Sequence, residues 1–91
     1  MGSLFVMIAK DGPDGARLRK EVRSEHLAHL DALVKAGKIA IAGPFTDGTG
    51  SLIVFEADSI EAAQAQAASD PYVTRGVFES FEVKPFKRVL P

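Results

Sequence analysis

SLFVMIAK at residues 3–10 and SLIVFEA at residues 51–57 are the two stretches that decide the fold of this chain. Each is apolar at nearly every position and contains β-branched and aromatic residues, as expected of a strand buried on both faces. Turn-forming residues bound them, because Asp11-Gly12-Pro13-Asp14-Gly15 follows the first run and GPFTDGTG at residues 43–50 precedes the second. Both runs are therefore predicted to be central strands of a sheet.

Two helices are predicted to connect the strands. Over residues 16–36, apolar side chains recur every three or four positions, which is the pattern of an amphipathic helix. Those positions are Leu18, Val22, Leu27, Leu30, Leu33 and Val34. Asp14 is expected to cap the start of this helix, and Gly37 supplies the left-handed residue that ends it. The second helix covers residues 60–68, and Ser69-Asp70-Pro71 ends it because the residue before a proline avoids helical angles.

The remaining strands are predicted at residues 39–42 and 78–85, which gives the element order β-α-β-β-α-β. This order is typical of a ferredoxin-like α+β fold, in which two helices cover one face of a four-stranded antiparallel sheet. In that fold the strands at residues 39–42 and 78–85 form the two edges of the sheet. In the final strand, alternation assigns Glu79, Phe81 and Val83 to one face and Phe78, Ser80, Glu82 and Lys84 to the other. We expect residues 1–91 to form one domain, with residues 86–91 as a C-terminal extension.

A second copy of the chain is the expected partner. Helices cover only one face of such a sheet, whereas the two central strands are apolar on both faces and need cover on the other side as well. No residues of the chain are left to provide it. A symmetric homodimer, packed sheet against sheet, would meet this need.

Composition excludes several classes of protein. The 91 residues contain 11 Lys and Arg against 12 Asp and Glu, so the formal charge is -1. A charge so close to zero, without a basic cluster, argues against nucleic-acid binding. The absence of cysteine excludes disulfides, thiol catalysis and cysteine-ligated zinc. Since the first apolar run is too short to span a membrane and does not resemble a secretory signal, the default expectation is a cytoplasmic protein without a membrane partner.

His26 is polar but is predicted to point into the fold. On a helical wheel of about 100° per residue, with Leu18 at zero, the apolar stripe centres near 90° and His26 lies at about 80°. Arg19 and Arg23 fall at about 100° and about 140°, on the buried side or at its edge. Each of these polar groups needs a partner. One interpretation is a core histidine bonded to the backbone with arginines reaching the rim; the other is a functional site.

Asp70 is the best candidate partner for His26. It follows the second helix on the helical side of the sheet, whereas Asp31 lies on the far side of the first helix and is expected to be a solvated surface charge. Asp-Pro is also a common helix start, in which the aspartate is the cap and the proline takes the first helical position. The two interpretations of Asp70 can coexist, because a capping carboxylate can also face a cleft.

No metal or cofactor site is expected. His26 and His29 are three residues apart, but the chain has no H-x-x-x-H or H-E-x-x-H motif and no obvious third ligand. His29 by itself is interpreted as structural or surface. The glycine-rich stretch at residues 43–50 lacks the Gly-Lys-Ser/Thr ending of a phosphate loop and is expected to be a mobile hairpin connection at the mouth of a pocket.

An ordered set of segments resembles the YciI-like, or YCII-related, family over nearly the whole chain. The segments are Arg23 to Leu30 (RSEHLAHL), Gly37 to Pro44 (GKIAIAGP), Ser51 to Ala57 (SLIVFEA), Asp70-Pro71-Tyr72 and Phe78 to Phe86 (FESFEVKPF). The resemblance implies a dimeric α+β barrel, in which two ferredoxin-like subunits pack their sheets together. It also implies an acid–base centre at His26 and Asp70, with Arg23 at the position of the family's preceding arginine. It supplies no substrate, since the reaction of the family is largely unassigned.

The leading hypothesis is a small-molecule enzyme with its site between helices and sheet. His26 would act as general base or acid, because its ordinary pKa of about 6.5 suits proton transfer near neutral pH. Asp70 would fix its tautomer, and Arg23 or Arg19 would bind an anionic group of the substrate. Ser51 could donate a hydrogen bond but is not proposed as a nucleophile. Isomerase, lyase or hydrolase chemistry without a cofactor fits these residues. The alternatives are a non-catalytic module that binds a small metabolite and a purely structural dimer.

Overall fold

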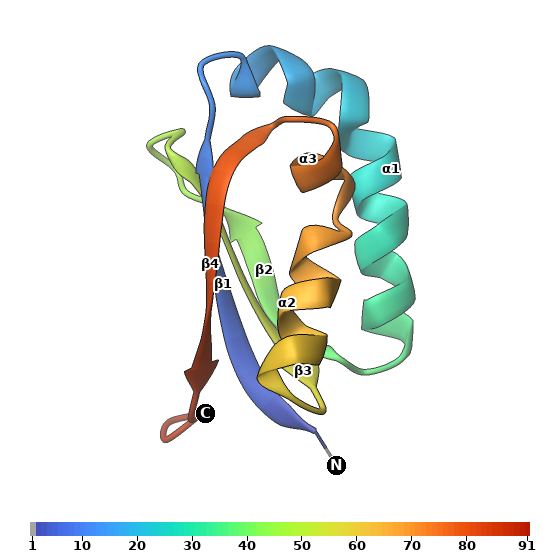
Figure 1. Ribbon diagram of the computed structural model, residues 1–91, viewed down its shortest axis with the longest axis vertical. Helices are drawn as coiled ribbons and strands as arrows, with labels where there is room; N and C mark the ends of the chain where they lie inside the picture. The colour runs from blue at the N-terminus through green and yellow to red at the C-terminus, as the bar shows by residue number, and fades with distance from the viewer. Residues whose placement is uncertain (1) are drawn as a thin grey trace.

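The computed structural model describes residues 2–91, which form one antiparallel sheet with helices on one of its faces (Figure 1). The four strands are β1 (Ser3–Asp11), β2 (Ile39–Pro44), β3 (Gly50–Ala57) and β4 (Phe78–Phe86). Their order across the sheet is β2-β3-β1-β4. The ferredoxin-like prediction is thus confirmed, including the central place of the two apolar runs. Phe86, which was expected to begin the C-terminal extension, is the last residue of β4, and residues 87–91 form neither helix nor strand.

Three helices lie on the same side of the sheet (Figure 1). They are α1 (Gly15–Lys35), α2 (Ile60–Ala68) and the single turn α3 (Pro71–Thr74). Gly37 ends α1 with a φ of 73°, and its N–H donates to the carbonyl of Val34. None of these helices in the described part of the chain is long and apolar enough to cross a membrane.

The three helix starts differ in how they are capped. Ser59 accepts a hydrogen bond from the N–H of Ala62 at the start of α2, and Asp70 accepts one from the N–H of Tyr72 at the start of α3. Asp14 occupies the cap position of α1, but its side chain makes no cap hydrogen bond, so that prediction is wrong. The reason is its backbone: φ of -102° and ψ of 11° lie outside the extended region from which a capping side chain reaches the first free N–H groups.

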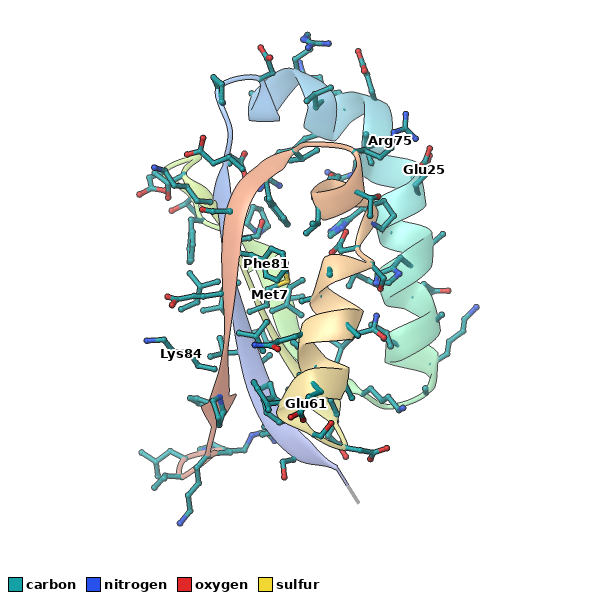
Figure 2. The ribbon with its side chains drawn as sticks, in the orientation of Figure 1. Met7, Glu25, Glu61, Arg75, Phe81 and Lys84 are labelled. Carbon is teal, nitrogen blue, oxygen red and sulfur yellow. The ribbon has the colours of Figure 1, made fainter. Side chains whose placement is uncertain are left out.

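The hydrophobic core lies between the sheet and the helices. Phe5, Met7 and Ala9 of β1 contribute to it, together with Ile53 and Phe55 of β3. Figure 2 shows Met7 and Phe81 pointing from the sheet toward the helices, whereas Lys84 points away on the opposite side. Apolar side chains on the helix-facing side are therefore the ones that fix how the helices sit.

A β-bulge changes the face assignment at the start of β4. The register pairs Ala9 with Phe81 but Asp11 with Phe78, because it shifts between Lys10 and Asp11. Paired residues share a face, so Phe78 faces the helices together with Phe81 and is only 5% exposed. The prediction that Phe78 faces the other way is wrong, because strict alternation takes no account of the extra residue.

Helix α1 buries a narrower stripe than its sequence predicts. Val22 is 1% exposed, but Leu27 and Val34 are 47% and 55% exposed. The helix packs against α3 and the edge strand β2, while α2 covers the other three strands. Leu27 and Val34 therefore lie at the outer rim of the contact, and their expected burial is not observed.

The opposite face of the sheet, which we call the open face, is apolar at its centre. Strand alternation and pairing place six apolar side chains on it. They are Leu4, Val6, Ile8, Ile41, Leu52 and Val54. Ile8 and Ile41 are 36% and 63% exposed, and none of the helices covers them.

Candidate active site

A cleft of about 180 Å³ opens between α1 and the ends of β2 and β3. Arg19, Arg23 and His26 line it from α1, and Ser51 lines it from β3. The structure therefore brings four of the sequence-predicted site residues to one place, and the fifth, Asp70, lies directly behind His26. Tyr72 of α3 also lines the cleft, and the remaining walls are apolar or small residues: Leu27, Leu30, Ala42, Gly43, Pro44 and Ile53.

His26 and Asp70 form a short hydrogen bond beside this cleft. The distance from Nδ1 of His26 to Oδ1 of Asp70 is 2.8 Å, and the two side chains are 12% and 2% exposed. A carboxylate only accepts hydrogen bonds, so Nδ1 of His26 carries the proton that is donated. Nε2 has no hydrogen-bond partner among the described residues, and in the neutral imidazole it carries the lone pair. The cleft is thus lined by an imidazole whose tautomer is fixed by Asp70.

Asp70 performs its capping role with the same atom. Its Oδ1 accepts from the N–H of Tyr72 at 2.8 Å as well as from His26. The two sequence-based interpretations of Asp70 therefore coexist. The single turn of α3 supplies the geometry, because Pro71 at its first position turns the next amide back toward the carboxylate.

The ring of Tyr72 stacks on the imidazole of His26. The two rings are parallel within 1°, with their centroids 3.7 Å apart. Tyr72 also makes a T-shaped contact with Phe78, with the two ring centroids 5.5 Å apart. Its hydroxyl donates to the carbonyl oxygen of Arg19 at 3.3 Å. Burial raises the pKa of the Tyr72 phenol above its ordinary value. No role for Tyr72 was predicted from the sequence; its place directly after Asp70-Pro71 was the available signal.

Arg19 is held by Asp11, a residue that the sequence placed only in a turn. Nε and Nη2 of Arg19 each lie 2.8 Å from one carboxylate oxygen of Asp11. Nη2 also donates to Oγ of Ser51 at 2.9 Å. The hydrogen bond to Asp11 raises the pKa of Arg19. The positive charge of Arg19 is therefore neutralised by Asp11. Arg19 is for this reason less suited to binding an anionic ligand than was predicted from the sequence.

Arg23 is the other arginine of the cleft and differs from Arg19. It lines the cleft, is exposed and has no ion pair or side-chain hydrogen bond with any residue that the structure describes. A guanidinium without a carboxylate partner is suited to binding an anionic group. Of the two arginines, Arg23 is the better candidate for recognising charge.

The other singled-out residues lie outside the cleft. His29 is half-buried and forms a hydrogen bond with Gln66, Nε2 to Nε2 at 2.9 Å. Asp31 forms an exposed ion pair with Lys35 at 2.9 Å, as expected of a surface charge. Within residues 2–91, no three His, Cys, Asp or Glu side chains are grouped so as to hold a metal ion.

The hairpin after β2 begins later than predicted. Gly43 and Pro44 belong to β2 rather than to a loop, and both line the cleft. The connection itself is residues 45–49, in which Asp47 accepts from the hydroxyl and the N–H of Thr49. The mouth of the cleft therefore has a rigid strand end on this side.

Comparison with known proteins identifies the family. Residues 3–87 match the family model described as the YCII-related domain. The chain belongs to the YCII-related domain family. It is 43% identical to Protein YciI of Escherichia coli over 97 aligned residues, which cover 96% of this chain and 99% of that protein. It is also 36% identical to an uncharacterized protein of Haemophilus influenzae, with 94% and 98% of the two chains covered.

A solved structure resembles this YCII-related chain along most of its length. It is the 5-chloro-2-hydroxyhydroquinone dehydrochlorinase TftG of Burkholderia phenoliruptrix, in complex with 2,5-dihydroxybenzoquinone. The TM-score is 0.81 at 30% sequence identity, with 92% of this chain and 93% of the other covered. The predicted family resemblance is confirmed, and one relative of this fold is an enzyme that acts on a small oxygenated ring.

Proposed function

We propose that this YCII-related protein is a small-molecule enzyme in which His26 transfers a proton. The observation that carries the proposal is the 2.8 Å hydrogen bond from Nδ1 of His26 to Asp70, which leaves Nε2 without a partner on a residue that lines the cleft. In this arrangement Nε2 accepts a proton from the substrate, and Asp70 stabilises the imidazolium that results. His26 then returns the proton to another atom or to water. Isomerase, lyase and hydrolase reactions all use such a step.

Arg23 is proposed to select an anionic substrate. The cleft combines this cation with apolar walls, which favours a compact molecule with one charged edge. The relative TftG supports the proposal, because its name describes a dehydrochlorinase and its bound molecule is a dihydroxybenzoquinone. A ring of that size carrying oxygen substituents is the first substrate class to examine.

The test is a turnover screen with paired histidine variants. Small carboxylates, lactones and hydroxylated quinones are offered to the wild-type protein, to His26→Ala and to His29→Ala. Loss of turnover in His26→Ala alone is the expected result, since His29 lies one turn further along α1 and does not line the cleft. Full turnover by His26→Ala would exclude the proposed role.

A non-catalytic module that binds a metabolite is the second candidate. The feature that favours it is Arg23, which can bind an anion without any proton transfer. The same screen separates the two candidates when binding is measured in parallel. A ligand that binds tightly, depends on Arg23 and is never converted would favour the binding module.

A homodimer through the open face is part of the proposal. Val6, Ile8 and Leu52 lie on that face over the two central strands, and none of the helices within residues 2–91 covers them. Burial of such side chains contributes roughly 25 cal/mol per Å², so a second open face is a favourable partner.

A further inference from the structure

Ser51 has a hydroxyl whose hydrogen-bond direction is fixed by its neighbour. Oγ of Ser51 lies 2.9 Å from Nη2 of Arg19. A guanidinium only donates hydrogen bonds, so the serine oxygen must accept. The serine proton is left to be donated elsewhere, and the described residues offer it no acceptor. Because Ser51 lines the cleft and is 6% exposed, the direction that remains open is the cleft.

Asp11 prevents Arg19 from turning away from Ser51. Two bonds of 2.8 Å hold the guanidinium in its plane, and the Asp11 and Arg19 side chains are only 10% and 22% exposed. The rings of Tyr72 and Phe78 also lie against the guanidinium carbon, at 5.2 Å and 5.6 Å. Arg19 is thus a rigid support and not a mobile surface cation.

Two glycines allow this support to form. A Cβ at Gly15 would lie 2.8 Å from Oδ2 of Asp11, so a side chain there would displace the carboxylate. A Cβ at Gly50 would collide with the carbonyl oxygen of Ala9, so only glycine lets β3 approach β1 directly before Ser51. Backbone and side chains together therefore determine where the hydroxyl lies.

We propose that Asp11 and Arg19 are positioning residues that fix the Ser51 hydroxyl as a hydrogen-bond donor to a carbonyl oxygen of the substrate. The inference rests on the proposed function, since the same cleft contains the base His26. A hydrogen-bond donor at Ser51 and a base at His26 that act on the same molecule define the class of substrate. That class is a carbonyl compound with a removable proton on the neighbouring carbon. Nε2 of His26 takes that proton, the C–H electrons form the new C=C bond, and the carbonyl electrons move to oxygen. Ser51 then stabilises the enolate oxygen.

Binding of 2,5-dihydroxybenzoquinone, measured by calorimetric titration, tests the proposal. Wild-type protein is compared with Ser51→Ala, Asp11→Asn and the double variant. Ser51→Ala should weaken binding by roughly 10-fold to 100-fold, which is the usual value of one hydrogen bond to a charged acceptor. Asp11→Asn should weaken it by a smaller factor. The double variant should bind as Ser51→Ala does, because Asp11 acts only through Ser51.

The control and a second variant keep the result interpretable. Asp14→Asn removes a 67% exposed carboxylate at the start of α1 and should leave the affinity unchanged. If Asp11→Asn does not fold, Gly15→Ala displaces the same carboxylate through the 2.8 Å approach of its Cβ and should weaken binding in the same way. Circular dichroism confirms the fold of each variant.

Three outcomes overturn the proposal. Additive losses in the double variant would show that Asp11 acts independently of Ser51. Tighter binding by Asp11→Asn would make Arg19 itself the anion receptor. Failure of the wild-type protein to bind the quinone would remove the oxygen-binding role. The proposed function fails on a different result, namely unchanged turnover in His26→Ala.

Discussion

The imidazole of His26 lies flat on the ring of Tyr72, with the two planes within 1° and the centroids 3.7 Å apart. The backbone amide of the same tyrosine donates to Asp70, the carboxylate that is hydrogen-bonded to Nδ1 of the imidazole. One residue therefore sets the plane of His26 and also fixes its partner. Such pre-organisation means that His26 would need no rearrangement to act as the proposed base.

Tyr72→Ala and Tyr72→Phe should separate packing from the hydroxyl contact. Tyr72 is 3% exposed, so removing its ring should lower the free energy of unfolding by about 3–5 kcal/mol, the usual cost of deleting a large aromatic side chain from a core. Tyr72→Phe keeps the stacked ring and loses only the 3.3 Å bond to the Arg19 carbonyl, so it should cost about 1 kcal/mol or less. Urea unfolding measures both. Equal losses in the two variants would contradict the packing argument.

Alkaline titration should show that Tyr72 ionises late. It is the only tyrosine of the chain, and there is no tryptophan, so the absorbance of its phenolate can be followed alone. Burial raises its pKa in the folded protein, while the unfolded chain should titrate near the ordinary value of about 10. The neutral phenol therefore contributes stability that is complete below about pH 10 and is lost as the pH rises through the folded pKa. Identical midpoints in native and denatured protein would refute this expectation.

Asp70→Asn should disturb the tautomer of His26 with a small effect on the fold. The Asn side chain still has an oxygen that can cap α3, so the change in stability should be small. It no longer provides the charge that favours the proton on Nδ1. Two-dimensional ¹H–¹⁵N spectra of the imidazole should show the Nδ1–H form in the wild-type protein and a larger fraction of Nε2–H in the variant. An unchanged tautomer would show that another group orients the ring.

The contrast between His26 and Asp11 shows how far the sequence could lead. Helical periodicity placed His26 on the inward face of α1, and the position of Asp70 after α2, on the helical side of the sheet, made it the natural partner. The hydrogen bond between them is present. The catalytic role of the pair stays a prediction. Asp11 stands in a run of turn residues, where an acidic side chain has an ordinary local explanation. Its partner Arg19 is eight positions away, and the bond depends on how β1 leads into α1.

Phe78 and Leu27 mark the limits of patterns read along one element. A single bulge turned Phe78 to the core face, which no alternation rule contains. Leu27 belongs to the apolar stripe of α1 by spacing, but it lies at the rim because α1 packs on α3 and an edge strand. Tertiary packing decides how much of a stripe is buried, so the wheel could rank His26 as inward without fixing the width of the contact.

Ile8→Glu tests the open face as a dimer interface. Sedimentation of the wild-type protein at micromolar concentration should give about twice the chain mass of 9.7 kDa. A charge at Ile8, over the central strand β1, would be desolvated in a sheet-to-sheet contact and should yield a monomer that still folds, since this side chain is already 36% exposed. Val34→Glu is the matched control: it places the same charge on an apolar residue of α1, 55% exposed on the helix side, and should remain a dimer. A wild-type monomer, or dissociation by both substitutions alike, would show that the open face is not where two copies meet.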